Sequence, residues 1–134
     1  MKIMAIDYGD ARTGIAVSDE LGILAGETFV ITQWDSQALA DTIAAEAKAR
    51  NVGTLVLGLP KNMDGTEGPR AEKSRAMKAL LEERGMTVVM WDERRTTVDA
   101  HRILHANGKK EKKHKAAVDA VAAALILEGY LGTL

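Results

Sequence analysis

The order of apolar segments along the chain limits the fold more than any other feature of this sequence. Short apolar runs come first, at Ile3–Ile6, at Gly14–Ser18 and within Ile23–Ile31, and glycine or polar residues separate them. Their length and their β-branched residues predict strands, of which the first two form a hairpin. The sheet is therefore expected to begin with antiparallel pairing.

After these strands the pattern alternates between helix and strand. The expected segments are a helix from Asp35 or Ser36 to Ala47, a strand at Thr54–Leu59, a helix at Arg70–Arg84, a strand at Thr87–Trp91, a helix from Thr96 or Thr97 to Asn107 and a final helix at Ala116–Leu131. The helices are inferred from apolar residues at helical spacing, and Thr54–Leu59 is continuously apolar, as in a strand buried on both faces.

The order β-β-β-α-β-α-β-α, which the final helix follows, predicts an α/β fold with a mixed five-stranded sheet and helices on both faces. A length of 134 residues is near the usual size of one domain, and no linker or repeat divides the chain. We expect a single domain over residues 1–134.

The composition excludes several kinds of site. The chain has no cysteine, which rules out disulfides, zinc–thiolate sites and thiol nucleophiles, so a bound metal needs oxygen or imidazole ligands. No apolar run approaches the roughly 18 residues of a membrane span, and Asp7 interrupts the N-terminal run before a signal peptide could form. A cytoplasmic protein without a membrane partner is expected.

Charge is distributed unevenly along the chain, although the net charge is only −1. Residues 1–68 carry five Lys and Arg against ten Asp and Glu, whereas residues 69–134 carry thirteen against nine. Much of the positive excess lies in the run Lys109–Lys115. This run is either a solvated loop or a loop that contacts phosphate groups.

Asp7 and Asp119 are the first candidates for chemistry. Asp7 follows an apolar strand, and ligands of α/β sheets gather at the carboxyl ends of strands, although a strand-end aspartate often only hydrogen-bonds its own turn. Asp119 is the lone charge in the apolar stretch Ala116–Leu127, so its carboxylate needs a partner. That partner is a metal ion, or else a cation such as Lys115 or Arg12.

Two adjacent acids, Asp92 and Glu93, end the strand that follows the second helix. Strand alternation sends them to opposite faces, so only one of them can join Asp7 directly. An ion pair with Arg94 or its neighbour is the simpler alternative. If carboxylates from these sources converge, each pair repels by about 4 kcal/mol at an effective dielectric constant near 20. Convergence then requires a divalent cation, Mg²⁺ or Mn²⁺, and such ions catalyse phosphodiester hydrolysis.

The loop Pro60–Pro69 leads into a predicted helix N-terminus, where free backbone N–H groups suit phosphate, with Lys61 and Arg70 nearby. Asn62–Gly65 would equally serve as a turn without any ligand.

Specific motifs give the chain a strong resemblance to the YqgF/RuvX family. They are Asp7-Tyr8-Gly9, Arg12-Thr13-Gly14 with Ile15–Asp19, Gly58-Leu59-Pro60 with Asn62–Thr66 and Gly68-Pro69-Arg70, Asp92-Glu93-Arg94 with Thr96-Thr97, and Asp119-Ala120. They span nearly the whole chain in the family's order.

The resemblance implies an RNase H-like, RuvC-related fold and a nuclease that helps to mature the 5′ end of pre-16S ribosomal RNA in a pre-ribosomal particle. It implies Asp7, Glu93 and Asp119 as catalytic carboxylates, with metal between Asp7 and Asp119 completed by Glu93 and with Asp92 as the alternative. The strand Thr54–Leu59 departs from the wider pattern because it ends without the acid that commonly supplies the second carboxylate.

The leading hypothesis is therefore a metal-dependent RNase. Its expected nucleic-acid contacts are Arg12, Lys61, Asn62, Arg70, Arg94, Lys109, Lys110, Lys112 and Lys113. The same site in a homodimer, rather than a monomer, would suit a Holliday junction resolvase that cuts branched DNA on two strands. A nucleotide-binding module like those of actin and sugar kinases is the alternative of another class, because a strand followed by Asp-Tyr-Gly also resembles their phosphate loop.

Overall fold

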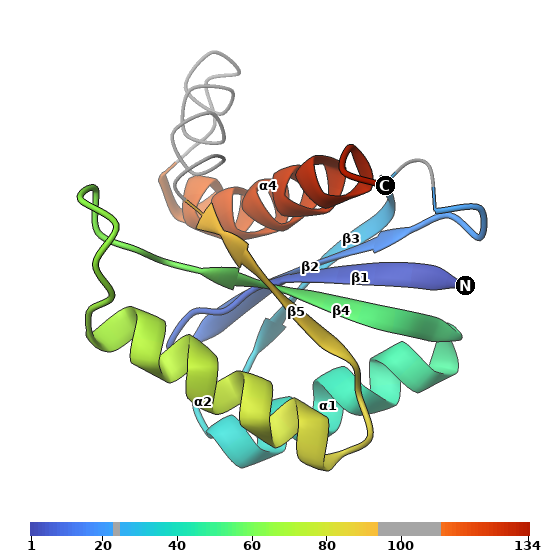
Figure 1. Ribbon diagram of the computed structural model, residues 1–134, viewed down its shortest axis with the longest axis horizontal. Helices are drawn as coiled ribbons and strands as arrows, with labels where there is room; N and C mark the ends of the chain where they lie inside the picture. Colours follow the sequence, from blue (N-terminus) through green and yellow to red (C-terminus); the bar gives the residue numbers. More distant parts are fainter. Residues whose placement is uncertain (23–24, 94–110) are drawn as a thin grey trace.

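A mixed sheet of five strands in the order β3-β2-β1-β4-β5 forms the centre of the molecule (Figure 1). The computed structural model describes residues 1–22, 25–93 and 111–134, and the side chains of 111–119 lie outside its description. Its elements are β1 (Lys2–Asp7), β2 (Arg12–Ser18), β3 (Ala25–Thr32), α1 (Ser36–Ala49), β4 (Val52–Leu59), α2 (Pro69–Glu83), β5 (Val88–Asp92) and α4 (Glu111–Leu131).

The central strand β1 is antiparallel to β2 and parallel to β4, and β5 continues the parallel half. Ile6 of β1 is in register with Leu57 of β4, and Leu59 of β4 with Asp92 of β5. The carboxyl ends of the three parallel strands therefore lie side by side at one end of the sheet, and Asp7 and Asp92 are both found there. This topology confirms the predicted α/β class and its mixed sheet.

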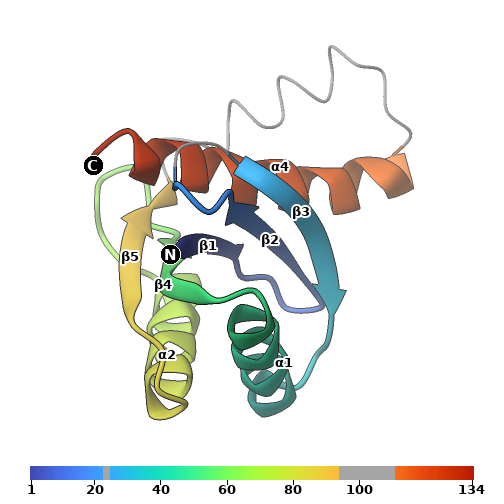
Figure 2. The same cartoon turned by 90° about the vertical axis from the view of Figure 1, so that its right-hand side faces the viewer.

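Helices cover both faces of the sheet, as the sequence predicts. Helices α1 and α2 lie on one side and α4 crosses the other, which is clearest when the molecule is turned by 90° (Figure 2). Strand alternation divides the core accordingly, because Met4 and Ile6 join the apolar cluster under α1 and α2, whereas Ala5 joins the cluster under α4.

The two clusters differ in the size of their side chains. The α1/α2 face is filled by large residues such as Ile15, Leu57 and Met77. The strands contribute only small or medium residues to the centre of the α4 face, namely Ala5, Ala16 and Val56. Two methyl-sized strand residues let the alanine-rich α4 pack directly on the sheet.

Local signals at the helix ends match the sequence pattern. Asp35 caps α1, because its side chain accepts a hydrogen bond of 2.8 Å from the backbone N–H of Ala38. Gly85 follows α2 with a φ of +83°, the left-handed conformation that glycine supplies at helix ends. The structure thus selects Asp35 from the two predicted caps.

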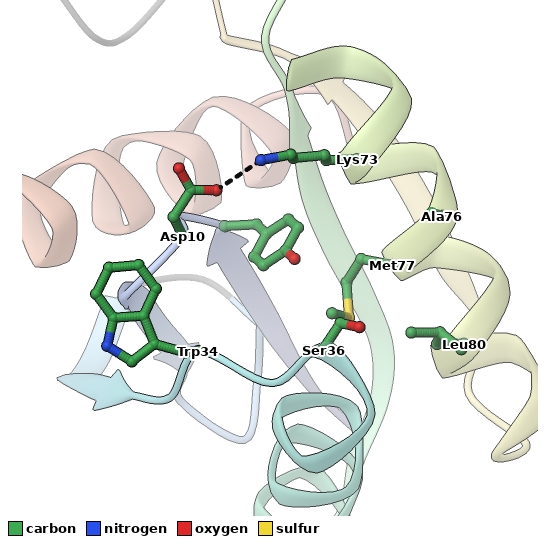
Figure 3. Close-up of a pocket in the computed structure, with 8 residues that line it drawn as sticks. Asp10, Trp34, Ser36, Lys73, Ala76, Met77 and Leu80 are labelled. Atoms are coloured by element: carbon green, nitrogen blue, oxygen red, sulfur yellow. Dashed lines mark hydrogen bonds and ion pairs between the residues drawn. The ribbon is translucent and has the colours of Figure 1, made fainter. Parts of the chain in front are cut away.

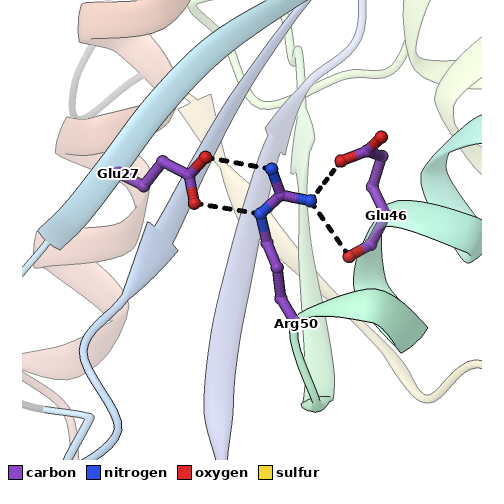
Figure 4. Close-up of polar contacts among 3 residues, drawn as sticks. All are labelled: Glu27, Glu46 and Arg50. Carbon is purple, nitrogen blue, oxygen red and sulfur yellow. Dashed lines mark hydrogen bonds and ion pairs between the residues drawn. The ribbon is translucent and has the colours of Figure 1, made fainter.

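A charge network ties the edge strand β3 to the end of α1 (Figure 4). Arg50 donates two hydrogen bonds of 2.9 Å to the carboxylate of Glu27 and also pairs with Glu46. Its guanidinium carbon lies 4.7 Å from the centre of the Phe29 ring, a cation–π contact.

The last helix corrects the sequence prediction. It was expected to begin at Ala116 after a basic loop, but α4 already includes Glu111 and the basic residues that follow it. Glutamate and lysine are good helix formers, and a glutamate suits the first turn of a helix. The helix predicted from Thr96 or Thr97 lies outside the described residues. Within the described part of the chain, no helix is both long and apolar enough to cross a membrane.

Candidate active site

Asp7 ends the central strand, and strand alternation sets the direction of its side chain. Ala5, two residues earlier, lies in the cluster under α4. Alternate residues of a strand face the same side of the sheet. Asp7 therefore points to the α4 side, at the carboxyl end of the parallel strands, and it is half-buried there.

Glu93 follows β5 directly, and its side chain is hydrogen-bonded to Asp7. Alternation explains why this acid, and not its neighbour, reaches Asp7. Trp91 packs on the α4 side of the sheet and Met90 on the opposite side. Glu93 shares the side of Trp91, whereas Asp92 shares the side of Met90. Of the two acids that the sequence left open, the structure brings Glu93 to Asp7.

Gly58 makes room for this contact. Strand β4 lies between β1 and β5, so a side chain that reaches from β5 to β1 must cross it. A Cβ atom at residue 58 would lie 2.5 Å from Oε1 of Glu93 and 2.7 Å from its Cδ, closer than Cβ atoms come to other atoms in proteins. The sequence shows that this strand ends without an acid, and the structure shows that its glycine lets the acid of the next strand lie over it.

Burial, together with the neighbouring Glu93, raises the pKa of Asp7 from 3.8 to about 9. Burial is the largest cause, followed by the hydrogen bond to Glu93 and its negative charge, while the positive charge of Arg70 lowers the pKa. Without a bound cation, Asp7 therefore holds a proton at neutral pH.

The donor atoms at this position suit a hard divalent cation. Mg²⁺ and Mn²⁺ prefer carboxylate oxygens, and the charge of a cation would offset both the burial of Asp7 and its repulsion from Glu93, which together keep Asp7 protonated. Among the side chains that the structure describes, no group of three Asp, Glu or His residues gathers in one place. Two of the three predicted carboxylates are therefore seen together.

Asp119, the third predicted carboxylate, belongs to α4, the helix that covers the face to which Asp7 points. Its side chain lies outside the described residues, so its membership of the cluster stays a prediction.

The predicted phosphate contacts are spread over several elements. Arg70, at the start of α2, is exposed and close enough to Asp7 to influence its pKa. Arg12 is exposed at the start of β2. Asn62 donates a hydrogen bond of 3.0 Å to the hydroxyl of Thr66, which in turn donates one of 2.6 Å to Asp64. These bonds form a turn within the loop that also carries Lys61.

The other side chains predicted to contact phosphate lie outside the described part of the structure. Arg94, Lys109 and Lys110 lie outside the described residues, whereas Lys112 and Lys113 lie in α4 with their side chains outside the description.

Sequence reasoning missed the importance of Gly58. A signal was present, because a glycine interrupts an otherwise apolar strand, and such a glycine often marks a close approach of another group.

Comparison with known proteins adds independent findings. Residues 1–133 match the model of the family RuvX, described as Holliday junction resolvase. A protein of Halothermothrix orenii named "Putative pre-16S rRNA nuclease" is 43% identical over 132 residues, which cover 98% of this chain and 94% of that protein. A protein of Acetivibrio thermocellus with the same name is 44% identical over 135 residues, with coverages of 98% and 95%.

Solved structures show the same fold at much lower sequence identity. RuvC of Thermus thermophilus in complex with a Holliday junction substrate has a TM-score of 0.60 at 14% identity, with 99% of this chain and 97% of that chain covered. The Fowlpox virus resolvase in complex with Holliday junction DNA has a TM-score of 0.58 at 14% identity, with coverages of 99% and 98%. These similarities support the RNase H-like, RuvC-related architecture.

Proposed function

This chain belongs to the RuvX family, and from that premise we propose that it is a divalent-metal-dependent nuclease that matures the 5′ end of precursor 16S ribosomal RNA. The observation that carries the proposal is the Asp7–Glu93 pair at the carboxyl end of the parallel strands. The names of relatives above 40% identity supply the substrate. The site of action would be a pre-ribosomal particle in the cytoplasm.

In this proposal Asp7, Glu93 and Asp119 hold the cation. Asp119 is part of α4, the helix that packs on the face of the sheet to which Asp7 points. A bound divalent ion would lower the pKa of an attacking water molecule and offset the charge that develops on the phosphate. Asp7 must release its proton when the ion binds.

The remaining roles belong to residues around the pair. Arg70 stands beside Asp7 and is exposed, so it can hold the phosphate next to the carboxylates. Glu93 can orient the water molecule, because a carboxylate accepts several hydrogen bonds. The other proposed contacts to the nucleic-acid backbone are Arg12, Lys61, Asn62, Arg94, Lys109, Lys110, Lys112 and Lys113.

The test is cleavage of a 5′-extended 16S rRNA fragment in buffer with Mg²⁺ or Mn²⁺. The Asp7→Asn and Glu93→Gln variants should each lose activity, on the order of 10² to 10³-fold, because each removes a charge that acts in the transition state. Asp41→Asn is the matched control, since Asp41 is an exposed acid of α1 paired with Arg84, which lies at the end of α2 opposite to Arg70. Cleavage by Asp7→Asn at the wild-type rate would exclude the assignment.

The family description favours a second substrate, branched DNA. A four-way DNA junction should be incubated in parallel, and the mass of the protein in solution should be measured, because symmetric cutting of two strands needs a dimer. Preferential cutting of the junction by a dimer would move the proposal from RNA to DNA while keeping Asp7 and Glu93 in their roles.

A further inference from the structure

An open hollow of about 520 Å³ lies beside the candidate active site and has no part in the function proposed so far (Figure 3). Three parts of the chain border it: the turn after β1, the connection from β3 to α1, and the side of α2 that carries Lys73 and Met77. Its volume falls within the range of pockets that bind small organic molecules, about 300 to 1,000 Å³. The hollow is therefore large enough for one nucleotide.

Trp34 stands at the border of this hollow with 76% of its surface exposed. The other large apolar residues that the structure leaves exposed are Met1, Leu21, Met63 and Leu134, none of which is aromatic. Trp91, the second tryptophan, instead packs into the core under α4. An exposed indole ring offers a flat surface on which a nucleobase can stack.

Charged and polar groups lie around the same hollow. Lys73 of α2 bonds to Asp10 at 3.1 Å across its upper border, and Ser36 lies at the opposite end, near Met77 (Figure 3). Both members of the ion pair are more than half exposed, so a phosphate group can compete for Lys73 at little cost. Asp10 and Ser36 provide oxygen atoms that can accept hydrogen bonds from a base or a ribose hydroxyl.

The hollow continues toward the carboxylates. A second, smaller depression is lined by Tyr8, Gly9, Asp10, Arg70 and Lys73, so it shares Tyr8, Asp10 and Lys73 with the first. Tyr8 packs on the α1/α2 side of the sheet, opposite to the side of Asp7, so the connection to the carboxylates runs through Arg70, which is near enough to lower the pKa of Asp7. Arg70 and Lys73 are three residues apart in α2, a spacing that places them on one face of the helix.

We propose that this hollow binds one unpaired nucleotide of the strand being cut, with its base stacked on Trp34 and its phosphate held between Lys73 and Arg70. The inference rests on the proposed nuclease function and specifies its substrate, a strand that is single-stranded next to the cleavage point. A base within a duplex is already stacked and paired, so it cannot enter the hollow without being flipped out.

Binding of a fluorescently labelled, single-stranded RNA octamer tests the inference. Anisotropy should be measured in EDTA, so that the result does not depend on cleavage. Trp34→Ala should weaken binding about 5- to 100-fold, the value of one base–aromatic stack, and Trp34→Phe should weaken it less. Leu21→Ala is the matched control, because Leu21 is as exposed as Trp34 but lies outside the hollow. Binding by Trp34→Ala within twofold of wild type would overturn the proposal.

The two tryptophans allow a second measurement. In a Trp91→Phe variant, Trp34 is the sole tryptophan, and a stacked base should quench its fluorescence in a saturable manner. Single-stranded RNA should quench it, whereas a blunt RNA duplex of the same sequence should not. Equal quenching by the duplex would contradict the requirement for an unpaired nucleotide, and quenching by single-stranded DNA alone would assign the hollow to a DNA strand.

The two proposals can fail separately. If Asp7→Asn abolishes cleavage while Trp34→Ala binds normally, the nuclease stands and the nucleotide hollow falls. If the wild type does not cleave but Trp34 is quenched as described, the hollow stands without the nuclease.

Discussion

The two faces of the sheet use the same strands for different purposes. On the α1/α2 side, large residues such as Ile6, Leu57 and Met77 are fully buried and fill the space between sheet and helices. On the α4 side, the centre of the sheet carries small or medium residues such as Ala5 and Val56, and Asp7 and Glu93 lie where the parallel strands end. Because alternate residues serve opposite faces, neighbours in the chain can affect stability and activity independently.

Leu57 and its neighbour Gly58 give the sharpest version of this comparison, and Leu57→Ala should have the largest effect. Leu57 is fully buried on the α1/α2 face, so truncation leaves a cavity that costs about 2–5 kcal/mol of unfolding free energy. Urea denaturation checks this. Activity per folded molecule should be nearly unchanged, and a selective loss of activity would show that the faces are not independent.

Gly58→Ala should show the opposite behaviour. The added methyl group displaces only the end of the Glu93 side chain, which can rotate away, so the midpoint of urea unfolding should move little. Cleavage should fall by about 10- to 100-fold, because a shift of about 1 Å in a catalytic group can cost that much. Full activity in Gly58→Ala would mean that the contact between Glu93 and Asp7 is not needed.

When no cation is bound, burial of Asp7 beside Glu93 should lower the stability of the folded protein. The folded state raises the pKa of Asp7 from 3.8 to about 9, so between these values it holds a proton that the unfolded chain has released. The free energy of unfolding therefore falls as pH rises through this window. Asp7→Asn does not titrate, and in EDTA at pH 8 it should be more stable than wild type by at least about 1.4 kcal/mol, the value of one pKa unit.

This effect should depend on both pH and metal. Thermal unfolding of the wild type and of Asp7→Asn should be measured between pH 5 and 9. The difference in stability between them should grow as pH rises, and Mg²⁺ or Mn²⁺ should raise the stability of the wild type alone. A difference in stability that is absent at pH 8, or that shrinks as pH rises, would contradict the buried arrangement of Asp7 and Glu93.

The smallest effect is expected at the border of the α1/α2 face. Glu27→Gln weakens the ion pair with Arg50, but Glu27 is half exposed and the pair is screened by water and salt. The unfolding free energy should change by less than about 1 kcal/mol, as measured by urea denaturation. A larger loss would mean that the charge network, and not the core beneath it, fastens β3 to α1.

Much of the fold could be predicted because its signals are local. Alternation and continuous apolar runs predicted the strands, and Asp35 and Gly85 predicted helix ends that the structure confirms. The start of α4 was misplaced because a run of lysines suits an exposed loop and an exposed helical turn equally well. Among the described residues the chain order of the elements is confirmed, because it depends on hydrophobic periodicity rather than on single residues.

The site was less predictable because its geometry depends on pairing between distant strands. The sequence left Asp92 and Glu93 open, and only the register of β5 in the sheet separates them. The roles of Gly58 and Trp34 could not be predicted for the same reason. A glycine or an exposed tryptophan becomes informative only when the structure shows which side chain lies over it or which hollow it borders.

The long sequence separation within the Asp7–Glu93 pair has a consequence for the synthesis of the protein. Glu93 comes eighty-six positions after Asp7 in the chain, and β4, which is also made later than Asp7, must take its place between them. A nascent chain that stops anywhere before residue 93 has no carboxylate pair. If the proposed function holds, the nascent nuclease stays inert at least until the ribosome has passed Asp119, the last of the three proposed carboxylates.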